Sequence, residues 1–279
     1  MFHVKKMSVE DFTFAIPLTD QMGWNLARSD FEFMMEPEPE GCFVLSEDLE
    51  RIGIVSTVSF GKIGWFGNLI VGENCRGKGA GSLMVRHSIK YPKTKNVETI
   101  GLYAYAERTP FYRRLGFKCD SDLMVLKGKG FTLPVRANLR EPSKKDVMKI
   151  IDFDQNCFGS SRRKVLEPIL PDSDNLCYMH IEEERILGCV IAKVFGKMIE
   201  LRTLACARGR NDIAVDLVKV MLNRLKDFEV STCIPKKETP IISMLMESGF
   251  SKSFKAARMF LGPSVAGNCI YLAESLERG

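Results

Sequence analysis

The sequence predicts a mixed α/β protein that contains two copies of one folding unit. Strand-like and helix-like runs follow one another in the order β-β-β-α-β-α over residues 42–117. A similar succession returns in the second half of the chain. The 279 residues are 45% apolar, which is enough for two ordinary hydrophobic cores. We therefore expect two domains, residues 1–130 and residues 131–279.

The first predicted elements are a helix, a loop and a three-stranded meander. Ser8 stands at an N-cap position before apolar residues at helical spacing, which predicts a helix up to Pro17. The segment EPEPEG, residues 36–41, contains two prolines and predicts a loop. Three β-rich runs joined by short turn signals predict antiparallel strands at residues 42–48, 51–60 and 63–71.

The elements that follow complete the first copy. Gly67 is isolated in the third strand, where a β-bulge can splay that strand from its neighbour. Pro110 and Gly116 are typical of the first turn and the end of a short helix. The remaining predictions are a helix at residues 81–91, a strand at residues 97–106 and a short helix at residues 109–117.

A glycine-rich loop joins the third strand to the following helix. The segment VGENCRGKGAGSLMV, residues 71–85, has glycines at 77, 79 and 81. Glycine has no Cβ and tolerates positive φ, so the backbone amides of such a loop can face a bulky anion. A helix that starts near Ser82 points its unpaired N–H groups and its positive dipole end the same way. The loop therefore predicts a phosphate site.

Spacing separates three kinds of phosphate loop. The pattern is not a P-loop, because Gly79 stands where a Ser or Thr would bind Mg²⁺. It is not a dinucleotide loop either, because the glycines follow G-x-G-x-G and no acidic residue stands about 20 positions later. The remaining pattern, Arg76-x-x-Gly79-x-Gly81 after a strand, resembles the acyl-CoA pyrophosphate loop of the GNAT (general N-acetyltransferase) superfamily.

Charge and composition exclude several classes of function. The net charge of +5 is mild and the basic residues are spread along the chain, so we expect no nucleic-acid partner. Residues 76–97 nevertheless hold six basic residues and no acidic one, which fits either a solvated helix face or attraction of a polyphosphate. The three histidines are far apart in sequence, so we expect no metal.

Cysteine usage and hydropathy indicate where the protein works. The nine cysteines show no C-x-x-C spacing and fit reduced, mostly buried thiols. The amino terminus has no apolar signal core, and nowhere are 18 consecutive residues apolar. We therefore expect a cytoplasmic protein without a membrane partner, and a homodimer is left open.

The second half repeats the first but has lost the loop. Residues 238–250 echo residues 107–117, and residues 199–222 echo the strand, loop and helix around the glycines. Asn211, Asp212, Ile213 and Ala214 now stand in place of the glycines. Their side chains prevent close approach to the backbone, and Asp212 would repel a phosphate. The sequence thus predicts a degenerate second copy.

Several stretches together resemble one family. GWN at residues 23–25, Asp30 with Phe31, EGCFV, RIGIVSTVSF, the glycine loop and FYRRLGF resemble the N-terminal domain of tandem GNAT proteins whose second half is a divergent GNAT-like repeat. The resemblance implies two GNAT-like domains, each a central mixed, mostly antiparallel sheet flanked by helices. It also implies acetyl-CoA as the donor and an amine, on a small molecule or a peptide, as the acceptor.

The resemblance assigns candidate site residues. Tyr112 takes the place of the tyrosine that assists the departing thiolate, although it also fits a packed aromatic on an amphipathic helix. The strand at residues 63–71 lacks the glutamate base that many members place there, so water, Glu107, Asp20, Asp30 or Glu32 is left as the base. Trp24, Asn25 and Asp30 fall in the acceptor-shaping region, where Trp24 also fits a core residue. The donor-binding candidates are Leu69, Ile70, Val71, Arg76, Gly77, Lys78, Gly79, Ala80, Gly81 and Ser82.

Two functions fit these features. The first is an N-acetyltransferase in which a primary amine attacks acetyl-CoA directly within a ternary complex. The N-terminal domain is then catalytic, and the C-terminal domain shapes the acceptor site or is structural. The alternative is a non-catalytic acyl-CoA-binding sensor or scaffold, which the degenerate second copy and the absent glutamate favour.

Overall fold

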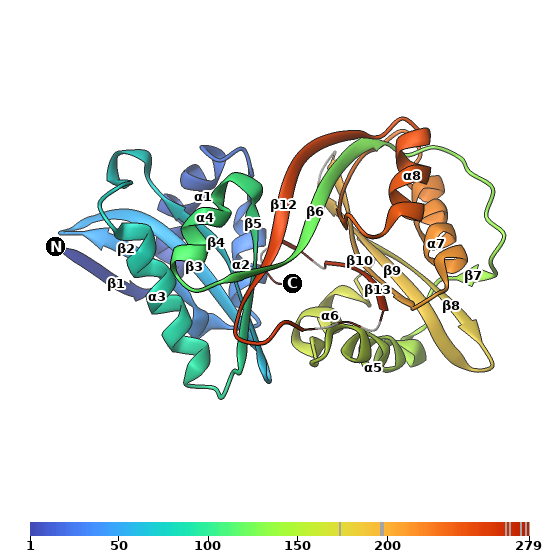
Figure 1. Ribbon diagram of the computed structural model, residues 1–279, viewed down its shortest axis with the longest axis horizontal. Helices are drawn as coiled ribbons and strands as arrows, with labels where there is room; N and C mark the ends of the chain where they lie inside the picture. Colours follow the sequence, from blue (N-terminus) through green and yellow to red (C-terminus); the bar gives the residue numbers. More distant parts are fainter. Residues whose placement is uncertain are drawn as a thin grey trace.

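A single mixed sheet runs through both halves of the protein. The computed structural model describes residues 1–172, 174–195, 198–265, 267, 269–273, 275, 276 and 278. Over these residues the sheet has 13 strands in the order β1-β2-β3-β4-β5-β12-β6-β11-β10-β9-β8-β7, and β13 pairs with β10. Figure 1 shows two lobes joined by the long strands β6 and β12, which run side by side between them. The predicted mixed α/β class, with a mostly antiparallel sheet, is confirmed.

The first half contains the predicted elements in the predicted order. The meander β2-β3-β4 is antiparallel, and β1, which the sequence reasoning missed, adds to its edge. The first helix was predicted to end at Pro17 but continues to Asp20, so the proline lies inside it. The elements are β1 (Phe2–Lys6), α1 (Phe12–Asp20), α2 (Arg28–Met35), β2 (Cys42–Glu47), β3 (Glu50–Phe60), β4 (Ile63–Val71), α3 (Ala80–Lys93), β5 (Thr99–Tyr105), α4 (Thr109–Arg114) and β6 (Lys118–Lys129), with 3-10 turns η1 (Val9–Asp11), η2 (Pro39–Gly41), η3 (Glu73–Cys75) and η4 (Ala106–Arg108).

The second half repeats this succession. A meander β8-β9-β10 is followed by helix, strand, helix and strand, as in the first half. The elements are β7 (Leu139–Arg140), η5 (Lys144–Asp146), α5 (Val147–Phe158), α6 (Arg163–Ile169), β8 (Asn175–Glu182), β9 (Arg185–Phe195), β10 (Met198–Ala207), α7 (Asn211–Arg224), β11 (Glu229–Pro235), α8 (Thr239–Glu247), β12 (Ser251–Leu261) and β13 (Cys269–Leu272).

The two halves exchange their equivalent strands. β6 follows α4 just as β12 follows α8, but each pairs with a strand of the other half. Residues 256–261 of β12 pair with residues 100–105 of β5, and residues 123–129 of β6 pair with β11. Neither half therefore completes its sheet with its own residues. The domain boundary at residues 130/131 therefore stays a prediction. β6, which precedes it, pairs with a strand of the second half, and β12, which follows it, pairs with a strand of the first half.

Apolar layers cover both faces of the sheet. In the first half, α3 packs Met84 and Val85 on one face, while α1 and α2 pack on the other. In the second half, α7 contributes the fully buried Leu217 to its own layer. A further layer joins the halves, because Trp65 of β4 packs with Phe158 of α5 and other residues of both halves. The halves therefore share buried apolar surface as well as strands.

The sequence predicted that all nine cysteines are reduced thiols, and this prediction is wrong for two of them. Cys157 at the end of α5 and Cys269 at the start of β13 form a disulfide across 112 residues of sequence. The other seven cysteines are free, and four of them are buried. Spacing arguments missed the pair because the fold alone brings the two positions together. The disulfide ties the C-terminal strand to a helix of the second half.

None of the helices that the structure describes is long and apolar enough to cross a membrane.

Candidate functional site

The strand before the glycine loop opens away from its parallel neighbour. β4 pairs with β5 only at Ile63, Gly64 and Trp65, and its later residues have no β5 partner. The β3-β4 register shifts beyond Gly67, where Asn68 has a φ of +52°. A bulge therefore lies next to the glycine that predicted it. The edge of β4 that carries the candidates Leu69, Ile70 and Val71 faces this opening, so its backbone groups can pair with an extended ligand.

The loop after β4 forms a bare backbone cradle. Gly77 and Gly79 have φ of +78° and +90°, which glycine adopts without strain. A Cβ at either position would meet no heavy atom within 4 Å, so the space outside both is open. Gly79 is also the N-cap of α3, and no side chain caps that helix. The first N–H groups of the helix, at Ala80, Gly81 and Ser82, therefore point into the same open space without helical acceptors.

The electrostatics around the cradle favour an anion. The first turn of α3 contains no acidic residue, so its dipole end is not neutralised from within. Arg76 donates from Nε to the Val71 carbonyl at 2.8 Å, which fastens the loop to the end of β4. Lys78 is exposed, and its Nζ lies 4.0 Å from Glu47. A diphosphate fits this set of unpaired amides, open glycines and positive charge, as a coenzyme A diphosphate requires.

Tyr112 lies between the cradle and the opened strand. Its ring centroid is 5.9 Å from that of Phe66 on β4 and 4.9 Å from that of Phe111. A Cβ at Gly81 would lie 3.5 Å from Phe111, so α4 borders the start of α3 directly. Burial raises the pKa of the Tyr112 phenol to about 12, which keeps it protonated at neutral pH. The phenol therefore stays protonated at neutral pH and can donate a hydrogen bond.

The candidate acceptor residues do not all have free side chains. Trp24 is half-buried and donates from Nε1 to the Tyr105 hydroxyl at 3.0 Å, at the end of β5. Asn25 is exposed and has a φ of +50°. Asp30 caps α2 by accepting from the Ala27 amide at 2.8 Å, and it lies 3.9 Å from Lys193 of the second half. Its carboxylate thus has structural partners, which weakens its assignment to a ligand.

The carboxylates proposed as bases differ in their surroundings. Glu32 pairs with Arg28 at 2.8 Å on the same helix, and Asp30 holds the contacts just described. Asp20 is exposed at the last residue of α1. Glu107 is exposed on η4, two residues after Tyr105 and two residues before the start of α4. Glu107 is therefore the candidate that lies nearest in the chain to both walls of the opening.

Sequence reasoning missed Glu38, a buried carboxylate that joins the halves. It accepts from Lys164 Nζ at 2.6 Å, from Tyr91 at 2.6 Å, and from Lys95. Burial alone would raise the pKa of Glu38, but these hydrogen bonds outweigh it and hold the pKa at about 2. Such a carboxylate is a poor proton acceptor, so Glu38 is structural. The segment EPEPEG gave no signal for this role, because its partners come from distant elements.

In the second half the equivalent opening is filled. β10 and β11 pair in parallel only up to Leu201, and β13 then pairs with residues 204–207 of β10. The amide of Thr203 also donates to the Ala273 carbonyl at 3.0 Å. Asp212 lies in the first turn of α7 and pairs with Arg210 at 3.1 Å. The predicted degenerate loop is thus accompanied by a strand that occupies the slot beside it.

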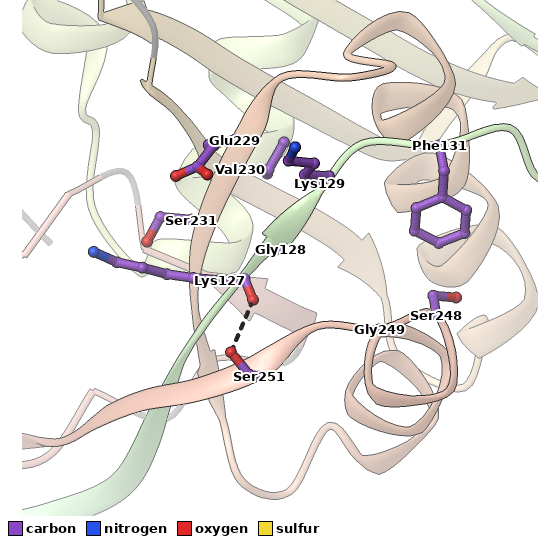
Figure 2. A pocket seen from close by; sticks show the side chains of 10 residues that line it. All are labelled: Lys127, Gly128, Lys129, Phe131, Glu229, Val230, Ser231, Ser248, Gly249 and Ser251. Atoms are coloured by element: carbon purple, nitrogen blue, oxygen red, sulfur yellow. Dashed lines mark hydrogen bonds between the residues drawn. The ribbon is translucent and has the colours of Figure 1, made fainter.

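A cavity also lies away from this site. It measures about 570 Å³ and is shown in Figure 2, where β6 and β11 meet the end of α8. Lys127, Lys129 and Glu229 line it with three serines, and Ser251 donates to the Lys127 carbonyl at 3.5 Å. It contains none of the predicted site residues. Among the described residues, no group of three or more His, Cys, Asp or Glu side chains is arranged as metal ligands are.

Comparisons with known proteins agree with this geometry. Residues 7–117 match the family model described as acetyltransferase (GNAT) family, and residues 150–271 match that described as acetyltransferase (GNAT) domain. A search of curated proteins gave no match.

Solved structures share the fold over nearly the whole chain. A candidate acetyltransferase from Pyrococcus horikoshii has a TM-score of 0.80 at 18% identity, covering 100% of this chain and 96% of the other. A tandem GNAT protein from the clavulanic acid biosynthesis pathway gives 0.67 at 11% identity, covering 95% and 100%. A GCN5-related N-acetyltransferase from Sphaerobacter thermophilus gives 0.65 at 14% identity, covering 96% and 98%. At these identities the likeness shows the fold.

Proposed function

Because the chain belongs to the GNAT acetyltransferase family, with one domain of the family in each half, we propose that it moves acetyl from acetyl-CoA to a primary amine. The difference between the halves carries the proposal. β4 opens from β5 beside a bare cradle, whereas β13 fills the same place beside β10. We accordingly place the reaction in the first half.

The donor would be held by backbone groups. The amides of residues 77–82 face the open space outside the glycines and suit the diphosphate. The unpaired edge of β4 at residues 69–71 suits the amides of the pantetheine arm. Acetyl-CoA would supply a thioester carbon open to attack by an amine. A backbone N–H near Ile70 or Val71 would polarise the thioester carbonyl.

Protein side chains would stabilise the departing thiolate and accept the proton of the attacking amine. Tyr112, whose pKa is about 12, is a weaker acid than an ordinary thiol with a pKa near 8.5, so it would donate a hydrogen bond to the thiolate and keep its proton. Glu107 or a water would accept the proton of the ammonium. Alignment of two reactants supplies effective molarities of about 10⁵ M or more, so the missing glutamate on β4 is compatible with catalysis.

The second half would shape the acceptor site. Its strand β12 lies directly beside β5, and its Lys193 lies 3.9 Å from Asp30 on α2. These contacts fix both sides of the region in which Trp24 lies. The second half, which has no open donor site of its own, would thus contribute to the acceptor site of the first half.

The experiment that tests this function measures thiol release with a panel of amines. We expect release that needs acetyl-CoA together with at least one amine among polyamines, amino acids, arylalkylamines, amino sugars and peptide N-termini. Acetyl-CoA at about 100 times its dissociation constant should also stabilise the fold by about 2.7 kcal/mol in a melting curve, and NAD should not. Donor stabilisation without release across the panel would show a sensor instead.

Replacement of Tyr112 tests the assignment of the leaving-group donor. We expect Tyr112→Phe to lower turnover by about 10- to 100-fold, because a hydrogen bond to a charged sulfur contributes about 1.5–3 kcal/mol. Acetyl-CoA binding should remain, since the ring and its contacts with Phe66 and Phe111 are kept. Phe111→Leu, next to it on α4, is the control for packing. Equal turnover in the wild type and Tyr112→Phe would remove this role.

A further inference from the structure

Three aromatic side chains from three distant segments meet beside the opening between β4 and β5. Trp24 comes from the connection between α1 and α2, Tyr105 ends β5, and Phe254 lies on β12. The Trp24 indole donates to the Tyr105 hydroxyl at 3.0 Å, and the rings of Tyr105 and Phe254 lie 4.9 Å apart between centroids. We call this group the aromatic wall.

The strand exchange places the wall at the opening. Ala256 of β12 pairs with Tyr105, which no longer pairs with β4 because the β4-β5 contact ends at Gly101. Directly paired residues share a face of a sheet, and so do residues two apart on one strand. Phe254 therefore lies on the same face as Tyr105, beyond the end of β5. η4 and α4, which carry Glu107 and Tyr112, follow Tyr105 immediately.

The wall is not part of the closed core. All three side chains keep partial exposure, whereas core neighbours on the same strands, such as Leu102 and Met259, are 1% and 0% exposed. The Trp24 hydrogen bond fixes the indole against the phenol, so these rings hold a set orientation. Rigid, partly exposed aromatic rings present large apolar surface at little cost in conformational entropy. They recognise flat apolar groups through ring contacts, and cations through the ring face.

We propose that the aromatic wall selects the acceptor, and that Phe254 of the second half determines specificity for a primary amine with an aromatic or bulky apolar body. This inference rests on the proposed function. The apolar body would pack on the wall while the amine faces the opening, where the donor would present its thioester. The second half would thus choose the substrate for a reaction carried out in the first.

The test compares two amines of different body, 2-phenylethylamine and ethanolamine. The wild type should prefer 2-phenylethylamine in kcat/KM. Phe254→Ala should lower kcat/KM for that amine about 10- to 50-fold, mainly through KM, because one apolar aromatic contact is lost. The value for ethanolamine and the dissociation constant of acetyl-CoA should change less than about 2-fold. Phe254→Leu, which keeps an apolar side chain at this position, should recover part of the lost kcat/KM. This recovery would show that the loss in Phe254→Ala does not come from a folding defect.

The matched control is Phe228→Ala, an exposed phenylalanine next to β11 that is 46% exposed and lies outside the wall. This variant should leave kcat/KM unchanged for both amines. Calorimetric titration of 2-phenylethylamine into the protein with coenzyme A supplies a readout without turnover, and Phe254→Ala should weaken that binding about 10-fold or more.

The outcomes separate this inference from the proposed function. Binding of 2-phenylethylamine that depends on Phe254, without thiol release by the wild type, would support the wall and overturn the transferase. The proposed role of the aromatic wall would be wrong if the ratio of kcat/KM for the two amines were the same in Phe254→Ala as in the wild type. It would also be wrong if 2-phenylethylamine did not bind to the wild type. Thiol release from other amines would then leave the transferase standing.

Discussion

Removal of residues 131–279 should leave the first half without a folded sheet. β5 lies between β4 and β12, so the deletion removes one of its two neighbours. The two strands that flank β6 are β12 and β11, so the deletion removes every sheet partner of β6. It also removes the buried side chains of Ala257 and Met259 from the core under α3. Loss of one large core side chain costs about 2–5 kcal/mol, against a total stability of about 5–15 kcal/mol. We expect no cooperative melting transition in circular dichroism for residues 1–130.

A cut in the same place is the matched control. A protease site can be inserted within residues 131–138, the connection from β6 to β7. Cleavage there breaks the chain, but every strand stays present as long as the two pieces remain associated. The cut protein should keep its melting transition, and the two pieces should elute together in size-exclusion chromatography. A monomeric fragment 1–130 that melts as cooperatively as the whole chain would contradict the prediction. It would show that β6 can return to β5, as domain-swapped strands can.

Gly81→Asp should lower acetyl-CoA affinity by about 100-fold or more. The new carboxylate would stand at the start of α3, where a Cβ lies 3.5 Å from Phe111 in the space between α3 and α4. Two unit charges about 5 Å apart repel by about 3 kcal/mol near a protein surface, and 1.4 kcal/mol is tenfold in affinity. Isothermal titration with acetyl-CoA measures the effect. The fold should be kept, because an acidic residue in the first helical turn is favourable.

Gly81→Asn is the control, since it has the same size without the charge. It should weaken binding far less than Gly81→Asp, and both variants should melt at or above the wild-type temperature without ligand. Gly79 is a poorer position for this test, because its φ of +90° would strain any other residue. Equal affinity in the Asp variant and the wild type would show that no diphosphate binds at the cradle.

Local patterns predicted much of the fold and the cradle. The glycine positions, the bulge beside Gly67 and the short helix with Pro110 and Gly116 each depend on conformational preferences of a few neighbouring residues, and the structure has them where expected. The two-copy organisation follows from the recurrence of these patterns, and both family matches confirm it.

The strand exchange could not be predicted in the same way. β6 and β12 have equivalent places in the repeat, so either could pair with β5 and satisfy the same alternation of side chains. The choice depends on long-range packing between the halves, which no short window contains. The aromatic wall was missed for this reason, because Phe254 reaches Tyr105 only through the exchange. The disulfide and the partners of Glu38 are likewise set by the tertiary fold.

The exchanged strands also constrain how the protein is made. A ribosome completes β5 about 150 residues before it completes the strand that covers it. At about 5–20 residues per second, the edge of β5 waits roughly 7–30 s for β12. That edge, TIGLYAY, contains no charge and no proline, and such segments template aggregation when they are left unpaired. The edge of β5 in a nascent chain is therefore a predicted aggregation site until β12 emerges, and faster elongation shortens its exposure.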